Sequence, residues 1–132
     1  MKRLFIIALA ALAGFLFNAC EKEGIVPDPT TYTINMQLSG VTPESKVKLD
    51  LIAFEYNQEN EKIASNSMNQ TNTGDIHTFT ANSKSVKVKI YASMSTTLST
   101  KHYWIQQVFY LEPEKNVEIV LKDDTMLGPD EP

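Results

Sequence analysis

The chain has 132 residues, of which 42% are hydrophobic, and this size and composition suit one domain with an ordinary core. Sixteen acidic residues outnumber twelve basic ones, and the resulting formal charge of −4 argues against a nucleic-acid partner. The single cysteine excludes both a disulfide framework within the chain and a thiolate metal cluster, so the fold must be stabilised by packing.

The first nineteen residues have the pattern of a secretory signal. Lys2 and Arg3 precede an unbroken apolar run over residues 4–17. This run is shorter than the roughly 20 residues that a helix needs to cross a membrane. A basic start, a short apolar run and then small residues are typical of a signal peptide that is removed. We therefore predict that residues 1–19 are a signal peptide, with cleavage between Ala19 and Cys20.

The Ala19-Cys20 junction resembles the lipobox of bacterial lipoprotein precursors. In that family the cysteine thiol receives a diacylglyceryl group, the preceding peptide bond is cut, and the new amine is acylated. Phe17 and Asn18 depart from the Leu and the Ala or Ser that are common in the motif. The resemblance implies that Cys20 is lipidated, with palmitate among its acyl chains. Because two or more acyl chains anchor a protein stably, the protein needs no transmembrane helix.

The anchored chain is expected in the cell envelope, held in the outer membrane and facing either the periplasm or the cell surface. Residues 20–31 follow the anchor as a flexible tether, with two prolines, an aspartate and a glycine. The acidic residues Glu21 and Glu23 are similar to the export signal that places Bacteroidota lipoproteins on the cell surface. A solvated linker would have the same composition, so the two interpretations stay open.

Residues 32–122 are predicted to form a β-domain. Apolar and polar side chains alternate over much of this region, whereas no segment shows a convincing helical period. Turn-forming residues interrupt the alternation, most clearly in the loop over residues 69–75. The predicted strands cover residues 32–38, 47–56, 62–68, 76–81, 86–91, 103–111 and 117–121.

The strand over residues 47–56 is expected to contain a bulge. Its apolar positions are first Val47, Leu49 and Leu51. They then shift by one residue, and Ile52, Phe54 and Tyr56 continue the apolar face. A single extra residue in a strand produces such a shift of phase.

About seven short strands at this spacing, without helical crossovers, predict an all-β fold. An antiparallel Greek-key sandwich fits best, and a small closed β-barrel is the runner-up. The pattern is similar to the small immunoglobulin-like or transthyretin-like domains that Bacteroidota lipoproteins often carry. Residues 123–132 form an acidic C-terminal tail that is expected to be loose.

The residues that could carry chemistry are few. His77 and His102 lie on different predicted strands and lack the spacing of zinc ligands. No Gly-x-Ser-x-Gly motif is present, and Cys20 is assigned to lipid, so nucleophilic catalysis has no candidate residue. The acidic pairs of the tail lack the spacing of an EF-hand loop. We expect no enzymatic activity, no metal and no cofactor.

Two neighbouring strands are expected to place aromatic side chains on one exposed face. If Val86, Val88 and Ile90 face inward, the residues between them face outward. In the 103–111 strand the more apolar set is Tyr103, Ile105, Phe109 and Leu111, which leaves the alternate residues for the opposite face. The predicted binding face therefore comprises Lys87, Lys89, Tyr91, Trp104, Gln106 and Tyr110.

Exposed aromatic patches often mark interaction sites, and sugars also stack on such rings. The alternative is that a loop or the tail covers this face and the strand is buried on both sides. The first functional hypothesis is a non-catalytic binding or scaffold module for a glycan or a partner protein of the envelope. The second rests on a resemblance to the small lipid-anchored inhibitors that Bacteroidota pair with papain-like cysteine proteases. An inhibitor would need a protruding loop, for which residues 69–75 are the candidate.

Overall fold

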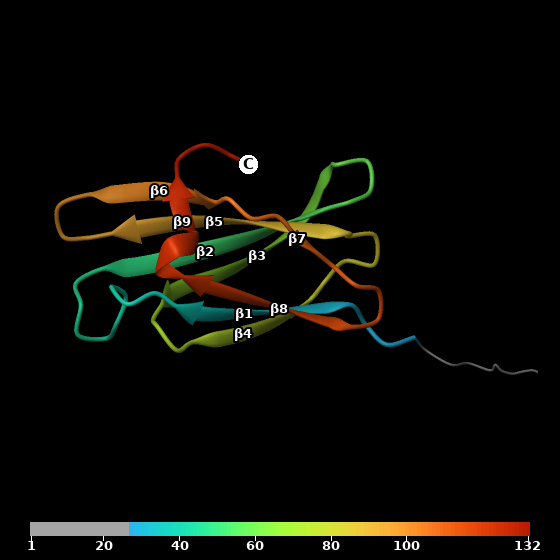
Figure 1. Cartoon of the computed structure of the whole chain (residues 1–132), viewed down its shortest axis with the longest axis horizontal. Helices are drawn as coiled ribbons and strands as arrows, with labels where there is room; N and C mark the ends of the chain where they lie inside the picture. Colours follow the sequence, from blue (N-terminus) through green and yellow to red (C-terminus); the bar gives the residue numbers. More distant parts are fainter. Residues whose placement is uncertain (1–26) are drawn as a thin grey trace, which may run out of the picture.

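The computed structural model describes residues 27–132, apart from the side chains of Met126 and Leu127. The predicted signal peptide, its cleavage site at Ala19 and Cys20, and most of the predicted tether lie outside the described residues. Figure 1 draws the described part as a stack of strands joined by short connections.

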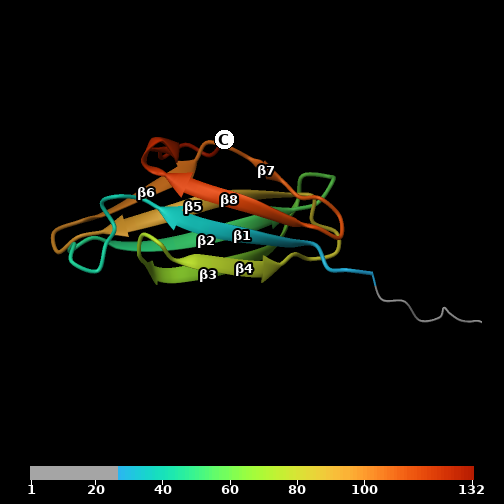
Figure 2. The same ribbon diagram turned by 60° about the horizontal axis from the view of Figure 1, so that its bottom comes forward.

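The strands form two sheets that lie face to face (Figures 1 and 2). The three-stranded sheet has the order β4-β1-β8, from β1 (Thr31–Gln37), β4 (Ile76–Thr80) and β8 (Asn116–Lys122). The main path of the six-stranded sheet has the order β3-β2-β5-β6-β9. Its strands are β2 (Lys48–Tyr56), β3 (Lys62–Thr71), β5 (Lys87–Ser95), β6 (Thr100–Ile105), β9 (Met126–Gly128) and β7 (Phe109–Tyr110), which pairs with β5.

This architecture confirms the predicted all-β sandwich. The described strands make two separate sheets, so the closed barrel that was the runner-up is wrong. The strand pairs are antiparallel except for β1 and β8, which run parallel from Thr31↔Asn116 to Gln37↔Lys122. In the immunoglobulin constant-type order the first two strands are neighbours. Here β1 and β2 lie in opposite sheets, so the strand order is a different one.

The core lies between the two sheets and follows the predicted alternation. Successive side chains of a strand point to opposite faces, so every second residue enters the core. Core side chains come from both sheets, and those with no exposed surface include Tyr32, Ile34, Met36, Leu49, Leu51, Ile90, Ile105, Ile119 and Leu121. The hydrophobic pattern thus sets which face of each strand is buried.

The bulge predicted within residues 47–56 is wrong. Pairing of β2 with β5 runs without interruption from Lys48↔Ser95 to Tyr56↔Lys87. The two shifts of register occur between β2 and β3, where β3 contributes the extra residues. The inner face of β2 therefore continues through Ala53 to Glu55, which are both 1% exposed. Consequently Phe54 and Tyr56 lie on the outer face of the sheet instead of continuing the core face.

The predicted strand over residues 103–111 is divided into β6 and β7. Both pieces pair with β5, at Tyr91↔Trp104 and Val88↔Phe109, and residues 106–108 between them belong to neither strand. The inward set is as predicted, because Ile105, Phe109 and Leu111 are buried and Tyr103 packs against the core. Val86 was expected to face inward and is instead 37% exposed, since it precedes β5.

A buried carboxylate joins the two sheets. Glu55 Oε2 accepts hydrogen bonds from the Tyr32 hydroxyl of β1 at 3.0 Å and from Asn66 Nδ2 of β3 at 2.9 Å. Glu55 Oε1 accepts from Ser85 Oγ at 2.7 Å and from the Asn82 backbone N–H at 2.8 Å. Burial raises the pKa of Tyr32 well above its ordinary value; the hydrogen bond from Asn66 opposes this rise and the Glu55 carboxylate adds to it.

We predict that Glu55→Ala lowers the free energy of unfolding by about 3 kcal/mol or more, because it leaves several buried donors unpaired. Urea unfolding followed by far-ultraviolet dichroism measures this change. Glu59→Ala is the matched control, since Glu59 is exposed, and it should stay within about 0.5 kcal/mol of the unmodified protein. Equal stabilities for the two variants would show that the network does not support the fold.

Candidate functional site

The candidate site lies on the outer face of the six-stranded sheet. Residues of β2, β5 and β6 that alternate with the core positions point to this face. Four rings gather there, and we call them the aromatic cluster: Phe54, Tyr91, His102 and Trp104.

Trp104 is the centre of the aromatic cluster. It lies opposite Tyr91 in the β5–β6 ladder, and the two rings meet edge to face with centroids 5.0 Å apart. The Phe54 ring of β2 lies 5.8 Å from Trp104, and His102 stacks on Tyr91 at 5.6 Å. Such pairs are worth about 0.5–1.5 kcal/mol each beyond the burial of their area. The rings are therefore held in place by one another and by the sheet.

A cation extends the aromatic cluster toward β3. Lys62 Nζ lies 4.0 Å from the centroid of the Phe54 ring. An ammonium over an aromatic face is attracted by the ring quadrupole. Phe54, Tyr91 and Trp104 are half-buried, whereas His102 and Lys62 are exposed. The cluster thus presents partly accessible rings with positive charge at one side.

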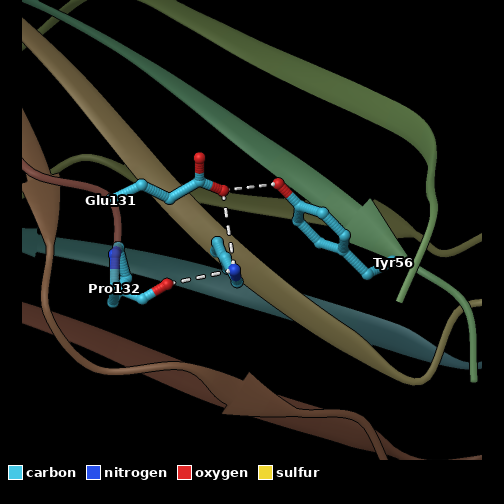
Figure 3. A network of polar contacts seen from close by, with 4 residues as sticks. Tyr56, Glu131 and Pro132 are labelled. Atoms are coloured by element: carbon cyan, nitrogen blue, oxygen red, sulfur yellow. Dashed lines mark hydrogen bonds and ion pairs between the residues drawn. The ribbon is translucent and has the colours of Figure 1, made fainter. Parts of the chain in front are cut away.

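A second group of side chains on the same face binds a carboxylate. Tyr56, Lys87 and Lys89 form what we call the carboxylate notch, in which Lys89 Nζ lies 4.9 Å and Lys87 Nζ 6.0 Å from the Tyr56 ring centroid. Glu131 Oε2 accepts a hydrogen bond from the Tyr56 hydroxyl at 3.1 Å and lies 3.5 Å from Lys89 Nζ (Figure 3). Lys89 Nζ also donates to the main-chain oxygen of Pro132 at 3.2 Å.

Residues 123–132 were expected to form a loose tail, but they are held against the sandwich, and their end fills the carboxylate notch. Asp123 accepts hydrogen bonds from the Ser39 backbone N–H and hydroxyl at 3.0 and 2.7 Å, and these bonds lower the pKa of its carboxyl group. The short 3₁₀ helix η2 (Asp123–Thr125) then leads to β9, which adds to β6 through Trp104↔Gly128 and Ile105↔Met126. Residues 129–132, which we call the strap, continue to Tyr56 and Lys89.

The structure brings together some of the predicted binding-face residues and separates others. Tyr91 and Trp104 are direct neighbours, as their predicted phases require. Tyr110 is 69% exposed but pairs with Lys87, at the other end of β5 from the aromatic cluster. Gln106 is exposed in the connection between β6 and β7.

Lys89 needs a correction, because it was expected to be exposed and is only 8% exposed. It does point to the outer face, but the strap covers it. Sequence reasoning also missed Phe54 and Tyr56, which the supposed bulge had turned toward the core. If the alternation is continued without a break from Leu49 to Glu55, with Glu55 as an inner residue, the sequence predicts that Phe54 and Tyr56 lie on the outer face.

The remaining candidate groups do not converge. His77 stacks on Phe79 in the three-stranded sheet, whereas His102 stacks on Tyr91 in the other sheet. Among the described residues, no cluster of three histidine, cysteine or acidic side chains could hold a metal ion. Within the same part of the chain, no helix is long and apolar enough to span a bilayer.

The loop expected at residues 69–75 is shorter than predicted, because β3 continues to Thr71. The turn that follows is tied to β1 by two backbone hydrogen bonds. Gly74 N–H donates to the Met36 carbonyl at 2.7 Å, and Met36 N–H donates to the Asp75 carbonyl at 2.9 Å. Asn72 N–H also donates to Asp75 Oδ2 at 2.8 Å within the turn, so the turn is braced internally as well as tied to β1.

Comparison of the chain with protein-family models, with curated proteins and with solved structures finds no match.

The strap contact predicts an alkaline transition at Tyr56. Burial, together with the hydrogen bond to Glu131 and the negative charge of Glu131, raises the pKa of Tyr56 to about 12. Because the pKa is higher in the folded state, the stabilisation is complete below the ordinary value of about 10 and is lost as pH rises through about 12. Glu131→Gln should move the transition of Tyr56 toward lower pH.

Phenolate absorbance measures this transition, and subtracting the titration of Tyr56→Phe isolates Tyr56 from the other tyrosines. Asp130→Asn is the control, since it removes a neighbouring charge without touching the Tyr56 hydroxyl bond. An unchanged Tyr56 midpoint in Glu131→Gln would contradict the contact in solution.

Proposed function

We propose that this protein is a lipid-anchored β-sandwich lipoprotein of the cell envelope that acts as a non-catalytic binding or scaffold module. Its ligand is a glycan or a partner protein of the envelope. The observation that carries the proposal is the aromatic cluster around Trp104, on the outer face of the six-stranded sheet. Rings held rigidly on a sheet offer contact area at low entropic cost, and sugar rings stack on such surfaces.

Several features of the fold support a binding surface rather than a reaction centre. The rings come from three adjacent strands of one sheet, so their spacing is set by the ladder. Lys62 adds positive charge beside Phe54, and His102 remains exposed at the edge of the cluster. A rigid platform with polar groups at its border suits recognition of a ligand that carries both apolar and polar faces.

The anchor completes the proposal. The basic start, the apolar run and the Ala19-Cys20 junction support lipidation of Cys20 and attachment to the outer membrane. β1 begins at Thr31, so about ten residues separate the proposed lipid from the sandwich.

Of the two proposed types of domain, we favour a transthyretin-like domain over an immunoglobulin-like one, because β1 and β2 are not neighbours. The inhibitor alternative depended on residues 69–75, and the bonds that tie this turn to β1 give it no support.

We expect Trp104→Ala to weaken ligand binding more than tenfold, since loss of a stacking ring at a binding hot spot costs about 2 kcal/mol or more. An oligosaccharide array followed by titration calorimetry measures the effect. The fold should be preserved, because Trp104 lies outside the core. Leu98→Ala is the control, since Leu98 is 94% exposed in the β5–β6 turn, away from the aromatic cluster.

Intrinsic fluorescence separates the two roles of Trp104, which is the only tryptophan. Partial quenching by iodide is expected for a half-buried indole. A signal that iodide does not quench, together with a large fall in the melting temperature of Trp104→Ala, would assign this residue to the core and remove the proposed binding surface.

For the anchor, Cys20→Ala is expected to release the protein from membranes and to abolish incorporation of a palmitate analogue. In-gel detection of the labelled protein and membrane fractionation measure both effects. Ser39→Ala, far along the chain, is the control and should keep its label. Label that persists in Cys20→Ala, or is missing from the unmodified protein, would refute lipidation at this residue.

A further inference from the structure

The free side of β6 is only partly covered. β6 pairs with β5 along one side over Thr100–Trp104. On the other side β9 pairs at only two positions, with an irregular register between Trp104 and Ile105. In the described part of the chain, residues 100–103 have no ladder partner on this side. The backbone groups of such an edge are a template for an added strand.

The carboxylate notch lies on the outer face of β2 and β5, on the side of Trp104 away from residues 100–103. Its chemistry is specific. The Tyr56 hydroxyl and the Lys89 ammonium converge on one oxygen, Glu131 Oε2. A phenol donor and a cation packed over an aromatic ring form a site for a single carboxylate. Lys87 places a second positive charge near the same ring.

Residues 126–132 occupy both parts at once. The backbone at Gly128 pairs with Trp104, and the carboxylate three residues later reaches Lys89. This combination is the general form of peptide recognition by strand addition, in which main-chain pairing supplies affinity and a side-chain pocket supplies specificity.

We propose that the β6 edge and the carboxylate notch together form a binding site for an extended acidic peptide segment of a partner protein, with residues 126–132 as its internal occupant. The peptide pairs with β6 at Trp104 and Ile105, as β9 does. Its chain then leaves the β6 edge and places a glutamate in the notch, three residues beyond the residue that pairs with Trp104. The internal segment competes with the partner and blocks the site until it is displaced. This site is separate from the ring surface under the proposed function, because it uses the β6 backbone, Tyr56 and Lys89.

The internal contact is suited to displacement. β9 is short, and the Glu131 side chain is 46% exposed while that of Lys89 is 11% exposed. Water and salt therefore screen the internal carboxylate more than the lysine that it covers. Charge complementarity favours an acidic occupant, since the notch carries two lysines and the segment that fills it contains Asp130 and Glu131.

The test supplies the segment in trans. The probe is a fluorescent peptide of residues 126–132 with an amidated C-terminus, and the receptor is the chain shortened to residue 125. Fluorescence anisotropy should show binding to the shortened chain and at least tenfold weaker binding to the unmodified chain. Binding should fall at least tenfold when the peptide carries Glu131→Gln or when the shortened chain carries Lys89→Met. Far-ultraviolet dichroism establishes that the shortened chain is folded.

A second receptor keeps the test decisive if the shortened chain does not fold. In the complete chain with Glu131→Gln the internal segment loses its carboxylate, so this variant should bind the unmodified peptide at least threefold more tightly than the unmodified protein does. Absence of binding to a folded shortened chain, or equal binding to the two complete chains, overturns the proposal. A concentration-dependent dimer of the unmodified chain that Lys89→Met abolishes would also overturn it, because the occupant in trans would then be a second copy. Every variant retains Trp104, so these outcomes leave the proposed ring surface to its own test.

Discussion

The buried Glu55 carboxylate is the interaction on which the arrangement of the molecule depends. It sits on the inner face of β2 and accepts bonds from β1, from β3 and from the segment before β5. A buried carboxylate is tolerated only where donors satisfy it. The hydrogen bonds to the Glu55 carboxylate therefore hold strands of both sheets at fixed positions and specify the packing at one end of the sandwich.

The same carboxylate determines what appears on the opposite face of β2. Because Glu55 points inward, its neighbours Phe54 and Tyr56 must point outward. Phe54 then joins Trp104, and Tyr56 receives Glu131. Both parts of the outer surface, the aromatic cluster and the carboxylate notch, thus follow from the placement of one polar residue in the core.

The segment after β8 links the two sheets a second time. Asp123 is fixed by Ser39, and the chain then crosses from the three-stranded sheet to β6 in the six-stranded sheet. The strap covers Lys89 and leaves the half-buried rings of Tyr91 and Trp104 beside it. The outer face is therefore divided between a surface that is partly open and a site that is already occupied.

Local pattern alone was sufficient for much of the fold. Alternating side chains identify most strands and their buried faces, because a strand with one side in a core must repeat with a period of two. Tyr91 and Trp104 could be placed on one face for the same reason, and the inward set of Ile105, Phe109 and Leu111 followed from it. The proposed signal peptide and the proposed lipidation of Cys20 also rest on the sequence alone, because motifs of this kind are defined by a short stretch of residues and not by a fold.

Tertiary structure decided the rest, because the deciding contacts join residues far apart in the chain. The residues adjacent to Glu55 in the sequence do not indicate that its carboxylate is buried, because its donors lie on other strands and connections. In the sequence, a polar residue within an apolar alternation has the same pattern as a shift of the apolar face by one residue. The extra residues lie in β3, so the irregularity could not be assigned from β2. An acidic, proline-containing segment has no local reason to be ordered. Its partners are all distant in the chain. Ser39 binds Asp123, the β6 backbone pairs with β9, and the Tyr56 hydroxyl and the Lys89 ammonium, placed together by the β2–β5 ladder, bind Glu131.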